Sequence, residues 1–390
     1  MNELLWLFLL LPVAAAGGWM LARRRGAVRE GERTARFSGH YFRGLNYLLN
    51  EQPDKAIEVF LRLAEVNQET VETHLALGNL FRRRGEVDKA IRFHKHIISR
   101  PELTEEQRTQ ALLELGEDYM RAGLLDRAEK LFSELVDHDQ HSDSATRHLL
   151  SVYQQEKDWE KAIEQALRLG RVTGESTVAM VAQFYCELAE EARVAGDDEG
   201  VMKGIRQARR YRPECARAHI IEARLAASRN RLEDAIEAYV AACELDPGCF
   251  PLVVDSLIEC CERAERLESA REWLEQVVAE YDGITPALAL ARLMGQSGRQ
   301  SEAARFMLGY LERRPSVRGL EYIVELMIER GAEEVGMDPE MLAEMVRRLL
   351  EGQPRFRCQH CGFSGQNHHW QCPSCRRWET TRPVAGVMGE

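Results

Sequence analysis

The sequence is short of positive charge and of catalytic motifs. It holds 52 lysines and arginines against 63 aspartates and glutamates, for a formal net charge of −11. A non-specific nucleic-acid binder needs a basic surface to displace counterions, so no nucleic-acid partner is expected. The GxSxG, P-loop, HExxH and dinucleotide-binding fingerprints are absent, and the chain is therefore not expected to be an enzyme. Aromatic residues reach only 7%, but 45% of residues are hydrophobic, which is too apolar for a disordered protein.

The N-terminal segment carries a long run without a charge, Leu4–Ala22. A helix of this length spans roughly 28 Å, close to the thickness of a bilayer core. A cleaved signal peptide would carry positive charge before its apolar stretch, whereas here Arg23, Arg24 and Arg25 follow it. The positive-inside rule predicts a transmembrane anchor at 1–22, with the N-terminus outside and the chain after it in the cytoplasm. Residues 23–37 form a basic juxtamembrane linker.

One small residue recurs through the middle of the chain at nearly constant intervals. The series is Ala56, Ala90, Ala128, Ala162, Val201, Ala235, Ala270 and Ala303. A period of about 34 residues is typical of tetratricopeptide repeats, in which each repeat is a helix–turn–helix unit. Small residues at one fixed distance before these anchors, such as Gly78 and Gly116, agree with a close helix crossing. About eight repeats are predicted over residues 38–316, and a degenerate capping helical pair over 317–352.

Most of the cysteines and one histidine are expected to pack in the repeats. The ten cysteines are unevenly spread, unlike those of a small secreted scaffold held by disulfides. Six lie between Cys186 and Cys261, where reduced cysteines pack as small hydrophobic side chains. His94 takes a repeat position that Phe60 and Phe132 hold elsewhere, which predicts that its ring packs in the core.

The first helices of such repeats line a groove suited to extended peptides or partner helices. Tetratricopeptide geometry places one set of side chains there in the second to fourth repeats, namely Asn79, Arg82, Arg83, Leu113, Glu117, Arg121, Arg147 and Gln154. We hypothesise that the four arginines among them form a basic strip that receives an acidic partner segment. The alternative is an ordinary solvated mixture of charges.

The last part of the chain, residues 353–390, contains the one clear chemical site. Cys358-x-x-Cys361 and Cys372-x-x-Cys375 are separated by ten residues, so two turns can present four thiolates to one metal ion. A tetrahedral four-sulfur site suits iron or zinc. Four thiolates fill the coordination shell, which indicates a structural or protein-binding site. An iron site that carries an electron stays open as the less favoured alternative.

The sequence therefore predicts an all-α tetratricopeptide-repeat solenoid, with a transmembrane helix before it and a small rubredoxin-like or zinc-ribbon knuckle after it. The anchor, the following arginines, the repeats and the terminal FRCxxCGF and HWxCPxC segments together resemble the lipopolysaccharide assembly protein B family of Gram-negative bacteria. The resemblance covers essentially the whole chain. The chain differs from true rubredoxins at Arg376, because rubredoxins carry a glycine after the last cysteine.

This resemblance implies a single-pass inner-membrane adaptor with a periplasmic N-terminus and a rubredoxin-like domain packed on the repeats. It implies that Cys358, Cys361, Cys372 and Cys375 bind iron or zinc. It also implies control of lipid A synthesis, in which the FtsH-type membrane protease degrades the committed-step deacetylase LpxC. A scaffold that gathers lipopolysaccharide synthesis or transport proteins at the inner membrane is the alternative function.

Overall fold

The computed structural model describes residues 46, 47, 55, 59, 71–137, 142–329 and 339–390. The predicted anchor at 1–22 and the linker at 23–37 lie outside the described residues, as does most of the first predicted repeat. Of the helices within the described ranges, none combines the length and the apolar character that crossing a membrane requires. The chain forms two compact units that divide between Thr173 and Gly174.

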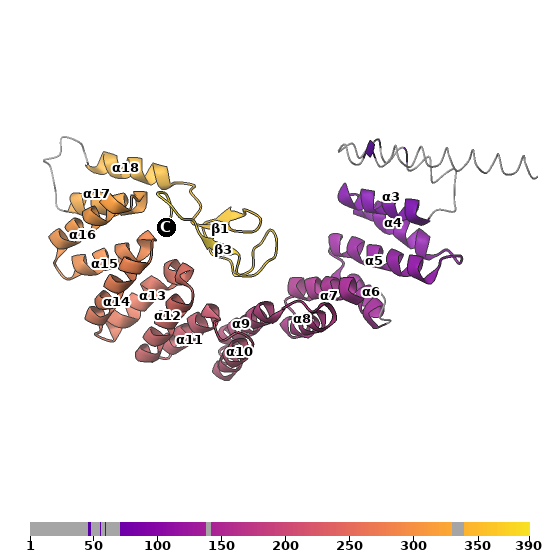
Figure 1. Cartoon of the computed structure of the whole chain (residues 1–390), viewed down its shortest axis with the longest axis horizontal. Helices are drawn as coiled ribbons and strands as arrows, with labels where there is room; N and C mark the ends of the chain where they lie inside the picture. The colour runs from indigo at the N-terminus through magenta and orange to yellow at the C-terminus, as the bar shows by residue number, and fades with distance from the viewer. Residues whose placement is uncertain (1–45, 48–54, 56–58, 60–70, 138–141, 330–338) are drawn as a thin grey trace, which may run out of the picture. The chain divides into compact units, whose positions relative to one another are not determined.

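The described part of the first unit is a stack of helix pairs in which each helix packs on the next (Figure 1). Its helices are α3 (Val71–Arg83), α4 (Val87–Ile98), α5 (Glu105–Arg121), α6 (Leu125–Asp137), α7 (Ser142–Glu156) and α8 (Trp159–Thr173). A capping box begins α5, because the Thr104 side chain accepts from the Gln107 amide and the Gln107 side chain accepts in return from the Thr104 amide.

The second unit continues the same helix-pair pattern and ends in a small sheet. Its helices are α9 (Val178–Ala195), α10 (Asp198–Tyr211), α11 (Ala216–Ser228), α12 (Leu232–Leu245), α13 (Phe250–Arg263), α14 (Leu267–Glu280), α15 (Ile284–Gln296), α16 (Gln300–Arg313), α17 (Val317–Glu329) and α18 (Pro339–Leu350). The last two lie where the sequence predicts a capping pair. The antiparallel strands β1 (Phe356–Cys358), β2 (Ser364–Gly365) and β3 (Thr381–Pro383) lie in the order β2-β1-β3.

The repeat anchors within the described residues are buried, and in two repeats the glycine before the anchor leaves room for a ring. Ala90 and Ala128 are completely buried. A Cβ added to Gly78 would lie 2.3 Å from His94 Nε2, and one added to Gly116 would lie 2.5 Å from Phe132 Cε1. Glycine in these positions therefore lets a ring from the second helix reach the backbone of the first. The same crossing explains the recurring spacing in the sequence.

Seven of the described repeats share one backbone conformation at the turn between their two helices, with or without glycine. At one position shortly before successive anchors, φ is positive and lies between 58° and 81°, namely at Gly85, Gly123, Lys157, Gly196, Asn230, Glu265 and Gly298. The sequence reveals this turn only where glycine stands. At the other three positions the packed helix pair holds an ordinary residue in the left-handed region, at a cost of about 1 kcal/mol each.

Candidate metal centre and repeat groove

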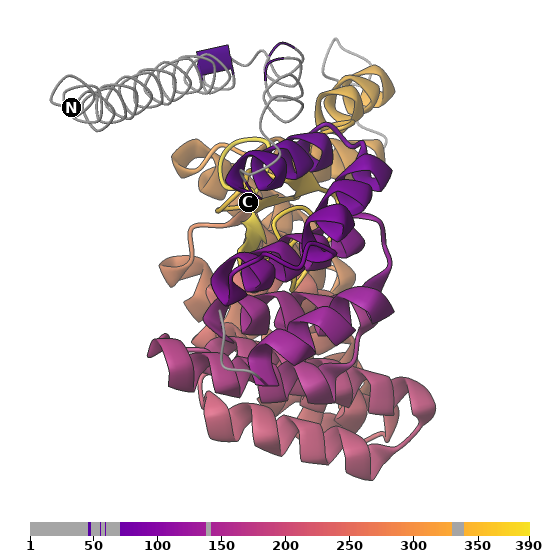
Figure 2. The same ribbon diagram turned by 90° about the vertical axis from the view of Figure 1, so that its right-hand side faces the viewer.

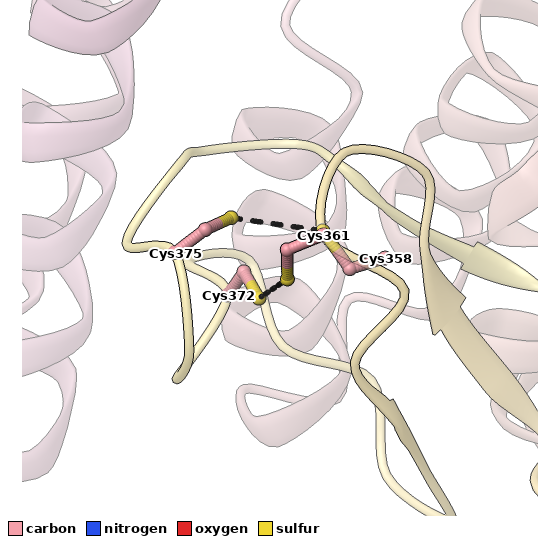
Figure 3. Close-up of side chains that lie close together, drawn as sticks. All are labelled: Cys358, Cys361, Cys372 and Cys375. Carbon is pink, nitrogen blue, oxygen red and sulfur yellow. Dashed lines mark hydrogen bonds between the residues drawn. The ribbon is translucent and has the colours of Figure 1, made fainter. Parts of the chain in front are cut away.

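Four cysteines from two separate turns converge near the end of the chain (Figure 3). Cys358 ends β1, and its Sγ lies 3.7 Å from that of Cys375; the Sγ atoms of Cys361 and Cys372 lie 3.6 Å apart. All four sulfurs are within 4.8 Å of one another, and none is in a disulfide. A tetrahedron with metal–sulfur bonds of about 2.3 Å has edges of about 3.8 Å. The donor set therefore fits one zinc or iron ion.

The two cysteine turns share one backbone pattern. In the first, the Cys358 amide donates to Phe363 O at 2.7 Å and the Gly362 amide donates to Cys358 O at 3.0 Å. In the second, the Cys372 amide donates to Arg377 O and the Arg376 amide donates to Cys372 O, both at 2.9 Å. Gly362 has φ of 78° and Arg376 has φ of 57°. Arg376 therefore holds in the second turn the backbone conformation that Gly362 holds in the first.

Arg376→Gly is expected to stabilise the folded protein by about 1 kcal/mol, because glycine adopts a positive φ without the clash that an L side chain meets. Gly362→Ala is expected to destabilise it by a similar amount for the same reason. Denaturation of the metal-loaded protein in guanidinium checks both changes. If both substitutions shifted the midpoint in the same direction, the equivalence of the two turns would be wrong.

Hydrogen bonds favour thiolates at the first turn. Burial opposes ionisation of Cys358, but the Thr380 hydroxyl, 3.2 Å from Sγ, and the amides of His360 and Cys361 lower the pKa of this thiol. The Phe363 amide likewise lowers the pKa of Cys361. Sulfurs that accept hydrogen bonds from these backbone amides are prepared to bind a cation.

The nearby histidine 368 packs instead of joining the sulfur cluster. Its ring meets Phe356 and Trp370 edge-on, with centroid distances of 5.5 and 4.7 Å. Burial lowers the pKa of His368 to about 4, so the ring is neutral at ordinary pH. Within the described chain, the cluster suited to a metal ion consists of the four cysteines alone. They leave no open coordination position for a catalytic water.

The metal knuckle, residues 353–390, is seated on the first helices of the second unit. Trp378 meets the fully buried Phe184 of α9 edge-on at 5.6 Å. The Gln183 side chain donates to Glu379 at 2.8 Å, and Arg212 forms an ion pair with the same carboxylate. Figure 1 shows the strands lying inside the curve of this unit, and Figure 2 gives the view turned by 90° about the vertical axis.

The contacts continue along the unit toward its last helices. The Arg217 guanidinium lies over the Trp370 ring at 5.3 Å. The Thr285 amide donates to Glu390 at 3.1 Å, and Arg318 forms an ion pair with the same side chain at 2.8 Å. Gln183, Arg217 and Thr285 each stand at the same distance before a repeat anchor, and these anchors are Val201, Ala235 and Ala303. One position of the repeat thus supplies three of the residues that contact the knuckle.

The sequence analysis does not predict these contact residues, because it names groove residues only in the second to fourth repeats. The signal that could have found them is a polar residue at one recurring repeat position. The six scattered cysteines, by contrast, all lie buried in the second unit, as expected.

In the first unit, the predicted basic strip is wrong at Arg82. This guanidinium is only 13% exposed and forms ion pairs with Glu114 at 2.7 Å, Glu117 at 2.8 Å and Asp118 at 2.9 Å. Three carboxylates therefore neutralise it, so it offers no charge to a partner. Leu113 also fails as a groove residue, because it is buried in the core.

His94 does more than fill the core position that phenylalanine holds in other repeats. Its ring does pack in the core, opposite Gly78. However, its Nδ1 lies 2.5 Å from Asp118 Oδ2, and both side chains are fully buried. Asp118 thus joins Arg82 of α3 to His94 of α4. The sequence treats these residues as separate charges, whereas the fold makes them one buried network.

Other predicted groove residues surround an open hollow of about 380 Å³. We call it the arginine hollow; it is lined by Arg82, Arg83, Glu117, Met120, Arg121 and His148. Arg83 and Arg121 are exposed, at the ends of α3 and α5. His148 lies 3.2 Å from Glu117 and, by hydrogen bonding, lowers the pKa of that carboxyl. Arg147 is exposed, and Asn79 and Gln154 are half-buried.

Known protein families match both the repeats and the metal knuckle. The family described as rubredoxin metal binding domain matches residues 356–383. The tetratricopeptide repeat family matches residues 43–93, 113–173 and 191–248. A solved structure of TPR-like repeats of a putative kinesin light chain from Podosopora anserina is 16% identical and covers 45% of this chain and 94% of its own. The TM-score between the two structures is 0.34.

Two relatives match this chain along nearly its whole length. Lipopolysaccharide assembly protein B of Escherichia coli strain K12 is 35% identical over 384 residues, which cover 98% of this chain and 99% of the relative. The protein of the same name from Haemophilus influenzae strain Rd is 32% identical, over 97% of this chain and 98% of its own. With this identity along nearly the whole length, and with the repeats and the metal knuckle matched as well, the chain belongs to the lipopolysaccharide assembly protein B family.

Proposed function

We propose that this protein is a non-enzymatic adaptor in lipopolysaccharide assembly, and that the arginine hollow binds its client. The observation that carries the proposal is the placing of Arg83 and Arg121 at the rim of a hollow on the first helices of two successive repeats. This is the surface that tetratricopeptide repeats offer to extended segments. The names of the full-length relatives support a role in lipopolysaccharide assembly.

The client we propose is an LpxC-type deacetylase, and the second partner is an FtsH-type protease in the inner membrane. The apolar run at residues 4–22 would confine the adaptor to the plane in which that protease lies. Holding the deacetylase there raises its effective concentration at the protease without any chemistry by the adaptor. The cell inner membrane, with the repeats in the cytoplasm, is accordingly the proposed location.

The metal ion has a structural role in this proposal, and zinc is the favoured ion. The four thiolates of Cys358, Cys361, Cys372 and Cys375 would hold it in a closed shell, so the ion would supply folding energy and no reaction. Because iron suits the same ligands, metal analysis of protein purified without added zinc distinguishes the two.

Reversing two charges tests the client site. Arg83→Glu combined with Arg121→Glu is expected to reduce capture of the deacetylase in a pull-down at least about tenfold, since like charges then oppose an acidic segment. Arg92→Glu with Lys130→Glu is the matched control, because both residues are exposed on second helices, α4 and α6. The control should bind normally. Equal capture by both double variants would contradict the assignment of the hollow.

A further inference from the structure

The last helix of the second unit, α18, carries an apolar stripe on its outer face. Met341, Met345 and Leu349 stand four residues apart and are 54%, 55% and 55% exposed. Residues at this spacing follow one another along one side of a helix. The opposite side of α18 is used for packing, because Ala343 and Val346 are each only 2% exposed. The helix is therefore apolar on two sides.

An apolar outer face is unexpected at the end of a repeat stack. A terminal helix has no following repeat to cover it, so its outer face is normally polar. Among the other helices of the described chain, α16 exposes one large apolar side chain, Leu308, and α9 and α17 expose two each, which stand eight or more residues apart along the helix. Two methionines and a leucine in one row form instead the kind of adaptable surface that proteins use for binding.

The charges beside the stripe indicate what covers it. Glu340 and Glu344 lie in the first half of α18, and Arg347 and Arg348 lie in the second half, all of them at the surface. Glu344 pairs within the helix with Arg347 at 3.2 Å and with Arg348 at 2.9 Å. When a second α18 is laid antiparallel, its basic half faces the acidic half of the first. The Glu344 carboxylate of one copy can then pair with an arginine of the other copy instead of one in its own helix. Little is lost by this change, because each exposed ion pair within the helix is weak.

We propose that α18 is the interface between two copies of this chain, which pair antiparallel about a two-fold axis at Met345. A row of side chains four residues apart packs into the matching row of a partner helix at an angle of about −50°. In this arrangement Met345 meets its own equivalent, and Met341 meets Leu349 of the other copy. Each copy uses the same surface, so the contact closes at a dimer.

The expected dimer is weak in solution. Three side chains and their neighbours cover less than the roughly 800 Å² per partner of a standard stable interface. Pairing is therefore expected to depend on protein concentration. The proposed membrane anchor would strengthen it by raising the local concentration, although the contact itself does not depend on the client-binding function.

Site-specific crosslinking of the full-length chain in membranes tests the geometry. With a short bis-maleimide, Met345→Cys is expected to give a covalent dimer, as is a mixture of chains carrying Met341→Cys and Leu349→Cys. Met341→Cys alone should crosslink several-fold less, since its equivalents lie on opposite sides of the axis. Leu308→Cys is the matched control, at 51% exposure on α16, and the unaltered chain reports any reaction of the exposed native Cys361.

Analytical ultracentrifugation of detergent-solubilised protein gives an independent readout. Met345→Glu should abolish the concentration-dependent rise in mass while leaving the circular dichroism spectrum unchanged, because the residue is at the surface. A Met345→Cys yield no greater than that of the Leu308→Cys control would overturn the proposal, as would preferential self-crosslinking of Met341→Cys. Capture of α18 by another protein or by lipid without dimer formation would overturn it as well.

Discussion

Replacing Cys358 and Cys361 with serine is expected to remove the metal ion and to release the C-terminal knuckle from the second unit. The knuckle is too small to fold on its own apolar core, so metal binding supplies most of its stability. Structural zinc in comparable small modules contributes about 10–16 kcal/mol. Metal content should fall from one ion per chain to none, and the contacts of Trp378 with Phe184 and of Glu379 with Gln183 should be lost together.

Hydrogen exchange at α9 and α11, measured together with metal content, checks this result. Loss of the knuckle uncovers the residues on which it sits, so protection there should fall. Gln359→Ser with His360→Ser is the matched control, because these exposed residues lie between the same two cysteines and should leave the ion bound. A metal-free double cysteine variant that kept full protection at α9 and α11 would contradict a structural role for the ion.

Asp118→Ala is expected to destabilise the first unit by about 3–5 kcal/mol, because it leaves buried charged and polar groups without their partner. Asp118 accepts from Arg82 at 2.9 Å and pairs with His94 at 2.5 Å, and it is completely buried. His94→Phe combined with Asp118→Leu should lose less, since Phe132 already fills the equivalent position opposite Gly116. Urea denaturation measures both variants.

A surface ion pair provides the comparison for this prediction. Asp198 pairs with Arg229 at 2.7 Å, but both side chains are about half exposed. Asp198→Ala should therefore change the denaturation midpoint very little, since water and salt screen such pairs. If Asp118→Ala were as mild as Asp198→Ala, the buried network would not be the element that joins α3, α4 and α5.

The repeats could be predicted from the sequence because every repeat solves the same packing problem. Buried anchors such as Ala90 and Ala128 must be small, and that requirement leaves a period in the sequence. The sequence indicates the left-handed turn only where glycine occupies it. At Lys157, Asn230 and Glu265 the conformation is imposed by the packed helices, so the residue type gives no signal.

The four cysteines could also be predicted, because metal geometry fixes their local spacing. The surface on which the knuckle packs could not be predicted, because the residues in contact are far apart in the sequence. Gln183 and Glu379, for example, lie 196 residues apart. The network at Arg82 was missed for a related reason. Whether an arginine is available to a partner depends on the carboxylates that the neighbouring repeat brings to it, and a pattern of charges does not contain that information.

We propose that the protein acts by holding a deacetylase beside a membrane protease. The half-life of the LpxC-type deacetylase should be measured in cells that depend on this chain, with and without residues 1–22. The account predicts that the shortened chain still captures the deacetylase in a pull-down but leaves its half-life several-fold longer, because capture away from the membrane does not raise its concentration at the protease. Normal turnover of the deacetylase with the shortened chain would contradict the account.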